Sequence, residues 1–310
     1  MEINYTIIIP HKNSPELLAH CLETIPVRDD VQVIVVDDNS DAGKVNFDDF
    51  PRWGGAHYEY YLTKEGKGAG YARNVGLEHA RGKWVLFSDS DDYFLPCISD
   101  VFDRERCTDA DILFYRPKAV ILGDSETPSK RAAHYERIVT EYLSHGDPYE
   151  LRCRFYSPWS KIIKRELIEA HHIRFEEIPY SNDYMFSVMV GCAAAKIEAR
   201  ATSYYVVTEG RKSLTAGFCQ KAGELQTRAG AYMRAQEVMA RFGYKMDEEN
   251  SRFYLNRLYV QDKEMFWACY RQLRTFGYSP IHIASIMYRY ERRPIRALKS
   301  IRLMICSVFR

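Results

Sequence analysis

The first third of the chain alternates short apolar runs with stretches of helical periodicity. Four runs have the length and the β-branched or aromatic content of buried strands, at residues 5–10, 31–36, 58–62 and 83–87. After the first run, Ser14 followed by proline and an acidic residue predicts a helix start with the Ser14 hydroxyl as N-cap. Strands alternating with helices predict a parallel, doubly wound sheet. Such a sheet binds its ligands beyond the carboxyl ends of its strands.

Polar residues gather where three of these strands end. Pro10 closes the first strand, Asp38 follows the second, and the segment 88–92 (Ser-Asp-Ser-Asp-Asp) follows the fourth. Three carboxylates within four positions repel one another unless a cation lies among them, and Mg2+ and Mn2+ prefer oxygen ligands. The pattern predicts a site for a metal ion and a diphosphate. The alternative is a solvated turn, or an acidic cap on the next helix.

Glycines at 66, 68 and 70 form a loop before a predicted helix through 71–77. The loop has neither the spacing of a P-loop nor the place of a dinucleotide fingerprint, which follows the first strand.

Four segments in this order carry a resemblance to a known family. Residues 8–13 (Ile-Ile-Pro-His-Lys-Asn), 35–40 (Val-Val-Asp-Asp-Asn-Ser), 72–76 (Ala-Arg-Asn-Val-Gly) and 88–92 resemble the four ordered motifs of family 2 glycosyltransferases. The resemblance is tight over about 3–115 and looser to about 215. It implies an inverting enzyme with the GT-A fold that uses a nucleotide-sugar donor.

The resemblance also implies roles for individual residues. Asp91 would ligate Mn2+ or Mg2+ at the donor diphosphate, and Asp89 would contact the metal ion or the ribose. The residues implied in donor binding are Pro10, His11, Asn13, Asp38, Gly68, Arg73, Asp89, Ser90, Asp91 and Arg211. Independently, an Asp can accept from the imide N–H of uracil, and an Arg can donate to a ring carbonyl. Two alternatives stay open: Asp38 as a turn residue, and Arg73 as a surface charge of its helix.

The second half resembles the acceptor side of the same family. A Trp-x-Lys stretch lies in 157–168, and 178–186 looks like the segment that carries the family's acidic pair. Asn182 stands where the family usually has Glu, whereas Asp183 keeps the second acid. The resemblance assigns Asp183 as the base that takes the acceptor proton. The alternative is that Asp183 caps the helix that follows. The loop 208–213 resembles a basic closing loop, or is a solvated surface loop.

Composition fits an enzyme with a sizeable core. The 310 residues are 46% hydrophobic with a net charge of +1, which indicates no nucleic-acid partner. The eight cysteines include no Cys-x-x-Cys, no secretory signal precedes the first strand, and no apolar stretch has the length of a membrane span. We therefore expect a cytoplasmic protein. The predicted organisation is a nucleotide-sugar-binding half (1–115), an acceptor-binding half (116–218) and a C-terminal helical region (219–310).

The end of the chain is basic. Seven positive residues and one negative residue lie between Arg289 and Arg310, beside an apolar stripe at helical spacing. A helix of this kind fits an anionic membrane surface, which would hold the protein at the inner face of the cell membrane. The alternative is a helix packed on its own core.

Together these features predict an α/β, GT-A-type, mostly parallel sheet flanked by helices, with a C-terminal helical appendage. The predicted activity is metal-dependent, inverting transfer of a sugar, UDP-linked in the favoured case, to a glycan or lipid-linked glycan acceptor in surface polysaccharide synthesis. A catalytically inactive protein of the same fold is one alternative. A sugar-phosphate nucleotidylyltransferase is another, although residues 10–13 are not the Gly-rich basic loop that it requires.

Overall fold

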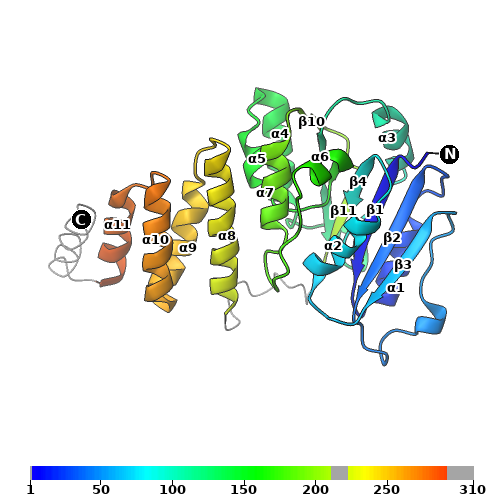
Figure 1. The fold of residues 1–310 in the computed structure, drawn as a ribbon, viewed down its shortest axis with the longest axis horizontal. Helices are drawn as coiled ribbons and strands as arrows, with labels where there is room; N and C mark the ends of the chain where they lie inside the picture. The colour runs from blue at the N-terminus through cyan, green and yellow to red at the C-terminus, as the bar shows by residue number, and fades with distance from the viewer. Residues whose placement is uncertain (1, 211–222, 292–310) are drawn as a thin grey trace. The chain divides into compact units, whose positions relative to one another are not determined.

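The computed structural model describes residues 2–210 and 223–291, which form two compact units, Met1–Phe218 and Cys219–Arg310 (Figure 1). Each unit is considered by itself. The first contains two sheets, and the second is helical. The predicted closing-loop residue Arg211 and nearly all of the basic segment 289–310 lie outside the described residues.

Four parallel strands build one half of the main sheet. They are β1 (Tyr5–His11), β2 (Val31–Asp38), β3 (Tyr58–Thr63) and β4 (Trp84–Phe87), in the order β4-β1-β2-β3. The connecting helices are α1 (Pro15–Glu23) and α2 (Ala69–His79), and a short 3-10 turn covers Phe47–Asp49. The four strands lie where the apolar pattern predicts them. The carboxyl ends of the neighbouring strands β4, β1 and β2 therefore meet at one edge.

The other half of the main sheet is mixed. Here β9 (Lys161–Lys164) runs antiparallel between β4 and β6 (Ile112–Tyr115), and β10 (Ile197–Arg200) pairs parallel with β6. Because β9 reverses direction, the sheet of seven strands is mostly parallel rather than wholly so. The Trp-x-Lys stretch thus leads into a strand first, and only then into the short helix α6 (Arg165–Ala170).

A second sheet packs beside the acidic segment. Its strands are β5 (Tyr93–Phe94), β11 (Tyr205–Glu209), β7 (Lys118–Ile121) and β8 (Asp124–Pro128), in the order β5-β11-β7-β8. The remaining helices of this unit are α3 (Ile98–Glu105), α4 (Ala133–His145), α5 (Tyr149–Arg154) and α7 (Tyr184–Ala193). Figure 1 shows α4, α5 and α7 grouped together. The β5–β11 pairing fixes the loop that precedes β5, which contains the acidic residues.

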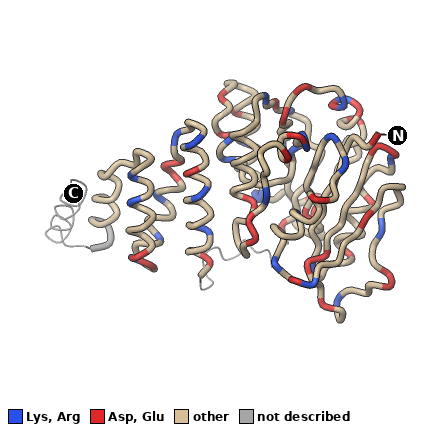
Figure 2. The backbone as a smooth tube through the Cα atoms, in the orientation of Figure 1, with Lys and Arg blue, Asp and Glu red and all other residues tan. Residues whose placement is uncertain are grey.

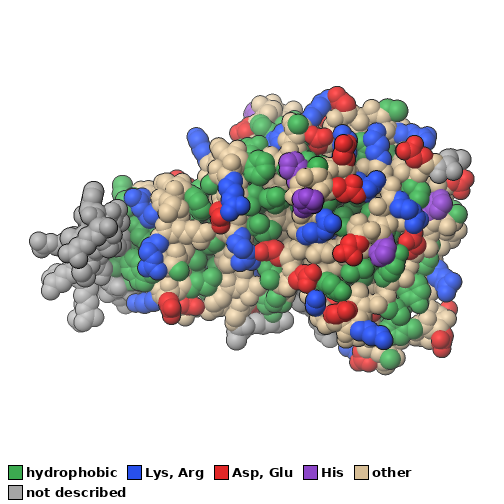
Figure 3. Space-filling model, viewed as in Figure 1, with side chains coloured by type: hydrophobic (Ala, Val, Ile, Leu, Met, Phe, Trp, Pro, Cys, Tyr) green, Lys and Arg blue, Asp and Glu red, His purple; other side chains and the backbone are tan. Residues whose placement is uncertain are grey.

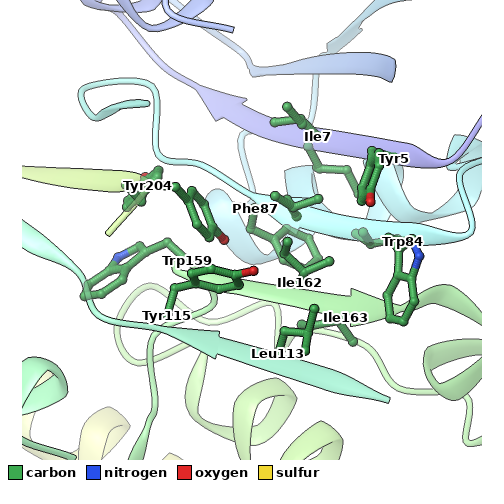
Figure 4. Close-up of a cluster of buried hydrophobic side chains, with 14 of the residues drawn as sticks. Tyr5, Ile7, Trp84, Phe87, Leu113, Tyr115, Trp159, Ile162, Ile163 and Tyr204 are labelled. Carbon is green, nitrogen blue, oxygen red and sulfur yellow. The ribbon is translucent and has the colours of Figure 1, made fainter. Parts of the chain in front are cut away.

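One hydrophobic core includes buried side chains from both halves of the main sheet, from β11 of the second sheet and from the flanking helices. Figure 4 shows Tyr5 and Trp84 near one end of the cluster and Tyr115, Trp159 and Tyr204 near the other. Tyr5 is fully buried, stacks on Phe102 with ring centroids 4.1 Å apart, and donates a hydrogen bond of 2.6 Å to the Phe102 carbonyl. Burying one large apolar side chain is worth about 1.5–3 kcal/mol. The strands that position the site are therefore anchored in a well-packed core.

The second unit consists of four described helices: α8 (Glu224–Arg241), α9 (Glu248–Gln261), α10 (Lys263–Thr275) and α11 (Pro280–Glu291). They are broken near Gly243 and Gly277, as the sequence predicts. Among their aromatic residues, Tyr254, Tyr259 and Phe266 are buried between helices, which supports a packing role. No helix in the described ranges is both long enough and apolar enough to span a bilayer.

One local prediction is wrong. Ser14 precedes α1 and proline opens the helix, but the Ser14 side chain makes no capping bond and its hydroxyl donates to the Lys12 carbonyl. The Ser14 N–H donates to His11 Nε2, within the turn between β1 and α1.

Charges of both signs are interspersed along the chain (Figure 2), and the face drawn in Figure 3 likewise mixes Lys and Arg with Asp and Glu.

Candidate active site

The ends of β1 and β2 are joined by a buried histidine. His11 Nδ1 lies 2.8 Å from Asp37 Oδ2, and His11 Nε2 accepts the Ser14 N–H at 3.1 Å. This network assigns the proton to Nδ1, which donates to Asp37. Burial acts to raise the pKa of Asp37, but hydrogen bonds from His11 and Ser40 outweigh it and hold that pKa below its usual value. Both ring nitrogens of His11 are thus used within the protein, and the residue supports the turn after Pro10.

Asp38 reaches from the end of β2 to the glycine loop. The Gly68 N–H lies 3.0 Å from both Asp38 carboxylate oxygens, and Lys12 Nζ lies 3.0 Å from one of them. Gly68 has φ of 95°, a conformation that favours glycine, and it directly precedes α2. Asp37, the neighbour of Asp38, makes the bond within the turn after β2, because its Oδ1 accepts the Ser40 N–H. Asp38 therefore holds the glycine loop against the sheet edge.

Asn13 connects the turn after β1 with the loop after β2. Its N–H donates to Ser40 Oγ at 2.8 Å, and its side-chain oxygen accepts the Asp41 N–H at 2.8 Å. With φ of 59°, Asn13 adopts the left-handed conformation that Asn tolerates better than most residues. The predicted donor-side residues Pro10, His11, Asn13, Asp38 and Gly68 therefore belong to one connected edge.

Arg73 projects from α2 into the interior. Its Nη2 donates to Asp89 Oδ1 at 2.6 Å, its Nη1 donates to Asn182 Oδ1 at 3.1 Å, and its guanidinium lies over the Phe175 ring. At 5% exposure it is not the surface charge of the alternative interpretation. Arg73 connects the acidic loop after β4 with the segment before α7. Its buried Nε has no hydrogen-bond partner among the described residues.

The acidic loop after β4 brings Asp89, Asp91 and Asp92 together, with one carboxylate oxygen of each within 4.8 Å of the others. Both Asp92 oxygens are already bonded: Oδ2 accepts from the Tyr205 hydroxyl at 2.8 Å and Oδ1 from the Thr208 N–H at 2.7 Å. By contrast, no side chain in the described ranges hydrogen-bonds the Asp91 carboxylate. Partial burial and the nearby Asp89 charge raise the pKa of Asp91 to about 6.

These carboxylates suit a hard divalent cation. Burial, followed by the charges of Asp89 and Asp91, raises the pKa of Asp92 well above its usual value, so each negative charge here opposes the others. A cation among them relieves that repulsion, and carboxylate oxygens are its preferred ligands. The Asp91 carboxylate and the second oxygen of Asp89 could bind the cation, because the other oxygens are already hydrogen-bonded. Asp92 supports the loop. Ser90, half-buried, lies between Asp89 and Asp91 in the sequence.

Asp183 lies just before α7, at its N-cap position, but its side chain makes no capping bond. Burial raises the pKa of Asp183; Arg73 and Lys161 oppose that shift, and Asp89 adds to it. These electrostatic contributions link Asp183 to the acidic loop and to the core of the sheet. Next to it, Asn182 accepts from Arg73, a bond that a Glu at this position would also accept. The substitution of Asn for the usual acid therefore leaves an oxygen facing Arg73.

Sequence reasoning missed three residues that shape the site. Tyr205 and Thr208 of β11 hold Asp92, and the Thr208 hydroxyl also donates to the Asp91 carbonyl at 2.7 Å. Lys161, 1% exposed, donates to the Phe155 carbonyl at 2.7 Å and lies over the Phe155 ring. Burial lowers its pKa to about 7. Only the Trp-x-Lys stretch gave a signal, for Lys161; Tyr205 and Thr208 look like ordinary strand residues.

Comparison with solved structures defines the fold class. The chain resembles the crystal structure of S. aureus TarS 1–349 in complex with UDP-GlcNAc, with a TM-score of 0.60 and 21% identity over 83% of this chain and 73% of that chain. The mixed seven-stranded sheet with flanking helices is accordingly a GT-A fold, as the sequence predicts.

Sequence comparison defines the family. The pattern of glycosyl transferase family 2 matches residues 6–171, more than half of the chain, and the chain therefore belongs to glycosyltransferase family 2. It is 27% identical to EpsH of Bacillus subtilis over 206 residues, which cover 64% of this chain and 57% of EpsH. It is also 27% identical to the teichoic acid poly(glycerol phosphate) polymerase of Staphylococcus epidermidis over 175 residues, 56% of this chain and 23% of the polymerase. The chain thus matches less than two thirds of the length of either relative.

Proposed function

We propose that this chain is an inverting glycosyltransferase that moves a hexose-type sugar from a UDP-linked donor to a glycan or lipid-linked glycan acceptor. The observation that carries the proposal is the convergence of Asp38, Arg73, Asp89, Asp91 and Asp183 around one sheet edge in a family 2 chain. The TarS structure, which contains UDP-GlcNAc, supports UDP as the nucleotide. One relative is named as a teichoic acid poly(glycerol phosphate) polymerase and another as a poly(ribitol-phosphate) β-N-acetylglucosaminyltransferase, which supports a surface polymer as the acceptor class.

The donor would be held by the edge formed by the β1, β2 and β4 ends. Asp38, which also holds Gly68 and Lys12, would accept the imide N–H of uracil with a remaining lone pair, and the turn braced by His11 and Asn13 would shape the base and ribose site. Arg73 holds the Asp89 carboxylate in place. A Mn2+ or Mg2+ ion bound by Asp89 and Asp91 would neutralise charge on the departing diphosphate.

The transfer itself requires a base. Asp183 would take the proton of the attacking acceptor hydroxyl as that oxygen bonds to the anomeric carbon and the bond to the diphosphate breaks. A single displacement of this kind inverts the anomeric configuration. The pKa of Asp183, raised by burial, makes the carboxylate a stronger base than an exposed one. Asn182 and Arg73 would fix the segment that carries it.

The test is a donor screen that measures nucleotide release from UDP-, GDP- and CDP-sugars, with Mn2+ and with EDTA. We expect release from a UDP-sugar that depends on the metal ion. Asp183→Asn keeps the shape but cannot take the proton, so transfer should fall about 10²- to 10⁴-fold with donor affinity unchanged. The exposed Asp100→Asn on α3 is the matched control and should behave as wild type.

Two results would contradict the proposal. If Asp183→Asn loses donor binding instead of transfer, Asp183 belongs to the donor site. If a UDP-sugar binds but is never consumed with any acceptor preparation, the chain is the inactive nucleotide-binding protein of the alternative interpretation.

A further inference from the structure

A cavity adjoins the acidic loop on the side of α1. Its volume is about 970 Å³, and Asp91 and Thr208 form one part of its wall. The rest comes from α1, β5 with the residues after it, and the β7–β8 hairpin. Most of these side chains are apolar: Leu17, Ile25, Phe94, Leu95, Pro96, Ile98, Val120, Ile121 and Leu122. This volume lies at the upper end of the range of small-molecule sites.

Two polar residues of the wall, Thr24 and Thr208, are already bonded within the protein. Thr24 Oγ1 donates to the Cys21 carbonyl and accepts the Phe94 N–H. Both the N–H and the hydroxyl of Thr208 are used by the acidic loop. Against the apolar side chains of the wall, the hydroxyls of a sugar ring would lose hydrogen bonds to water without gaining partners. The wall therefore suits an occupant that makes van der Waals contacts.

The mouth of the cavity combines apolar and polar side chains. Ile121 and Leu122 are 36% and 38% exposed, although both line the cavity. His20 and Glu23 of α1 and Asp124 and Ser125 of the β7–β8 hairpin also line it, with exposed side chains. Apolar side chains that remain in water at the mouth of an apolar cavity are typical of a binding site.

We propose that this cavity binds an apolar chain of the acceptor, with the polar head of the same molecule toward the acidic loop. Asp91 belongs both to the cavity wall and to the candidate metal site, so an occupant of the cavity reaches the place where transfer would occur. The ligand class is an amphiphile: an alkyl or isoprenoid chain that carries a sugar or phosphate head. This inference rests on the proposed glycosyl transfer, and it narrows the acceptor from any glycan to a lipid-linked one.

The experiment measures binding of hexyl, heptyl and octyl β-glucoside to the full chain, each below its critical micelle concentration, by calorimetry. Because each buried methylene is worth about 0.8 kcal/mol, affinity should rise about fourfold with each added methylene. Leu122→Asn replaces an apolar wall residue by a polar one of similar size and should weaken octyl glucoside binding about tenfold. Leu143→Asn on α4, 44% exposed and remote from the cavity lining, is the matched control and should bind as wild type.

UDP affinity, measured on the same samples, separates the two proposals. Equal affinity for the three glucosides overturns the cavity assignment, even where UDP binds normally. So does an equal loss of octyl glucoside affinity in the Leu122→Asn and Leu143→Asn variants. Binding that depends on chain length and on Leu122, in a chain that binds no nucleotide, supports the cavity assignment and refutes the proposed transfer.

Discussion

Replacing Tyr205 by Phe should destabilise the first unit and loosen the acidic loop. The Tyr205 hydroxyl is buried, donates to Asp92 at 2.8 Å and accepts the Asp89 N–H at 2.9 Å. Without it, Asp92, Ser88 and the Asp89 N–H each lose a hydrogen-bond partner, and an unsatisfied buried group costs about 1–3 kcal/mol. We therefore expect the free energy of unfolding to fall by about 2–5 kcal/mol.

The neighbouring tyrosine provides the control. Tyr204 is equally buried, but its hydroxyl makes a single bond of 3.2 Å to the Lys161 carbonyl, away from the acidic loop. Tyr204→Phe should cost only about 1 kcal/mol. The two variants remove the same atom from adjacent positions, so any excess effect of Tyr205→Phe reports the bonds to the loop.

Urea unfolding followed by tryptophan fluorescence measures the stability. Trp53, Trp84 and Trp159 all lie in the first unit, so the signal is dominated by that unit. Mn2+ binding by calorimetry gives the second readout. Residues that orient metal ligands typically account for about 10- to 100-fold in affinity. We expect such a loss for Tyr205→Phe and none for Tyr204→Phe. Equal stability losses, or unchanged Mn2+ affinity in both variants, would refute the role assigned to Tyr205.

Three further outcomes can be checked. Asp91→Ala should abolish Mn2+ binding and metal-dependent nucleotide release while the unfolding curve stays that of the wild type; full activity of this variant in EDTA would contradict the metal assignment. Burial lowers the pKa of Lys161 to about 7, so between that pH and about 10 the unfolded chain holds a proton that the folded chain lacks. The free energy of unfolding of wild type relative to Lys161→Met, measured with urea, should therefore rise by about 1.4 kcal/mol per pH unit over this range. A difference that does not change with pH would show that the amine is not desolvated. Deleting residues 290–310 should release the protein from anionic vesicles in a co-sedimentation assay, with the largest effect at low salt; equal binding of both forms would leave the basic segment without a membrane role.

Local patterns determined much of the first half of the fold. Apolar runs of strand length and a proline-initiated helix are properties of neighbouring residues, so β1 to β4, α1 and α2 lie close to where the sequence predicts them. The acidic residues at the end of β4 were likewise visible, because parallel strands bring their carboxyl ends to one edge. The family motifs extended the prediction to Arg73 and Asp183 as candidates.

Tertiary structure alone decided how these candidates are held. Tyr205 bonds Asp92, and Arg73 bonds Asn182, across more than 100 residues of chain. The antiparallel insertion of β9 places Lys161 in the core, where its charge acts on Asp183. The apolar cavity beside Asp91 needs α1, β5 and the β7–β8 hairpin in place together. Side-chain periodicity tells which face of an element is buried, but not which distant element covers it. That choice is made by the packing of whole sheets and helices.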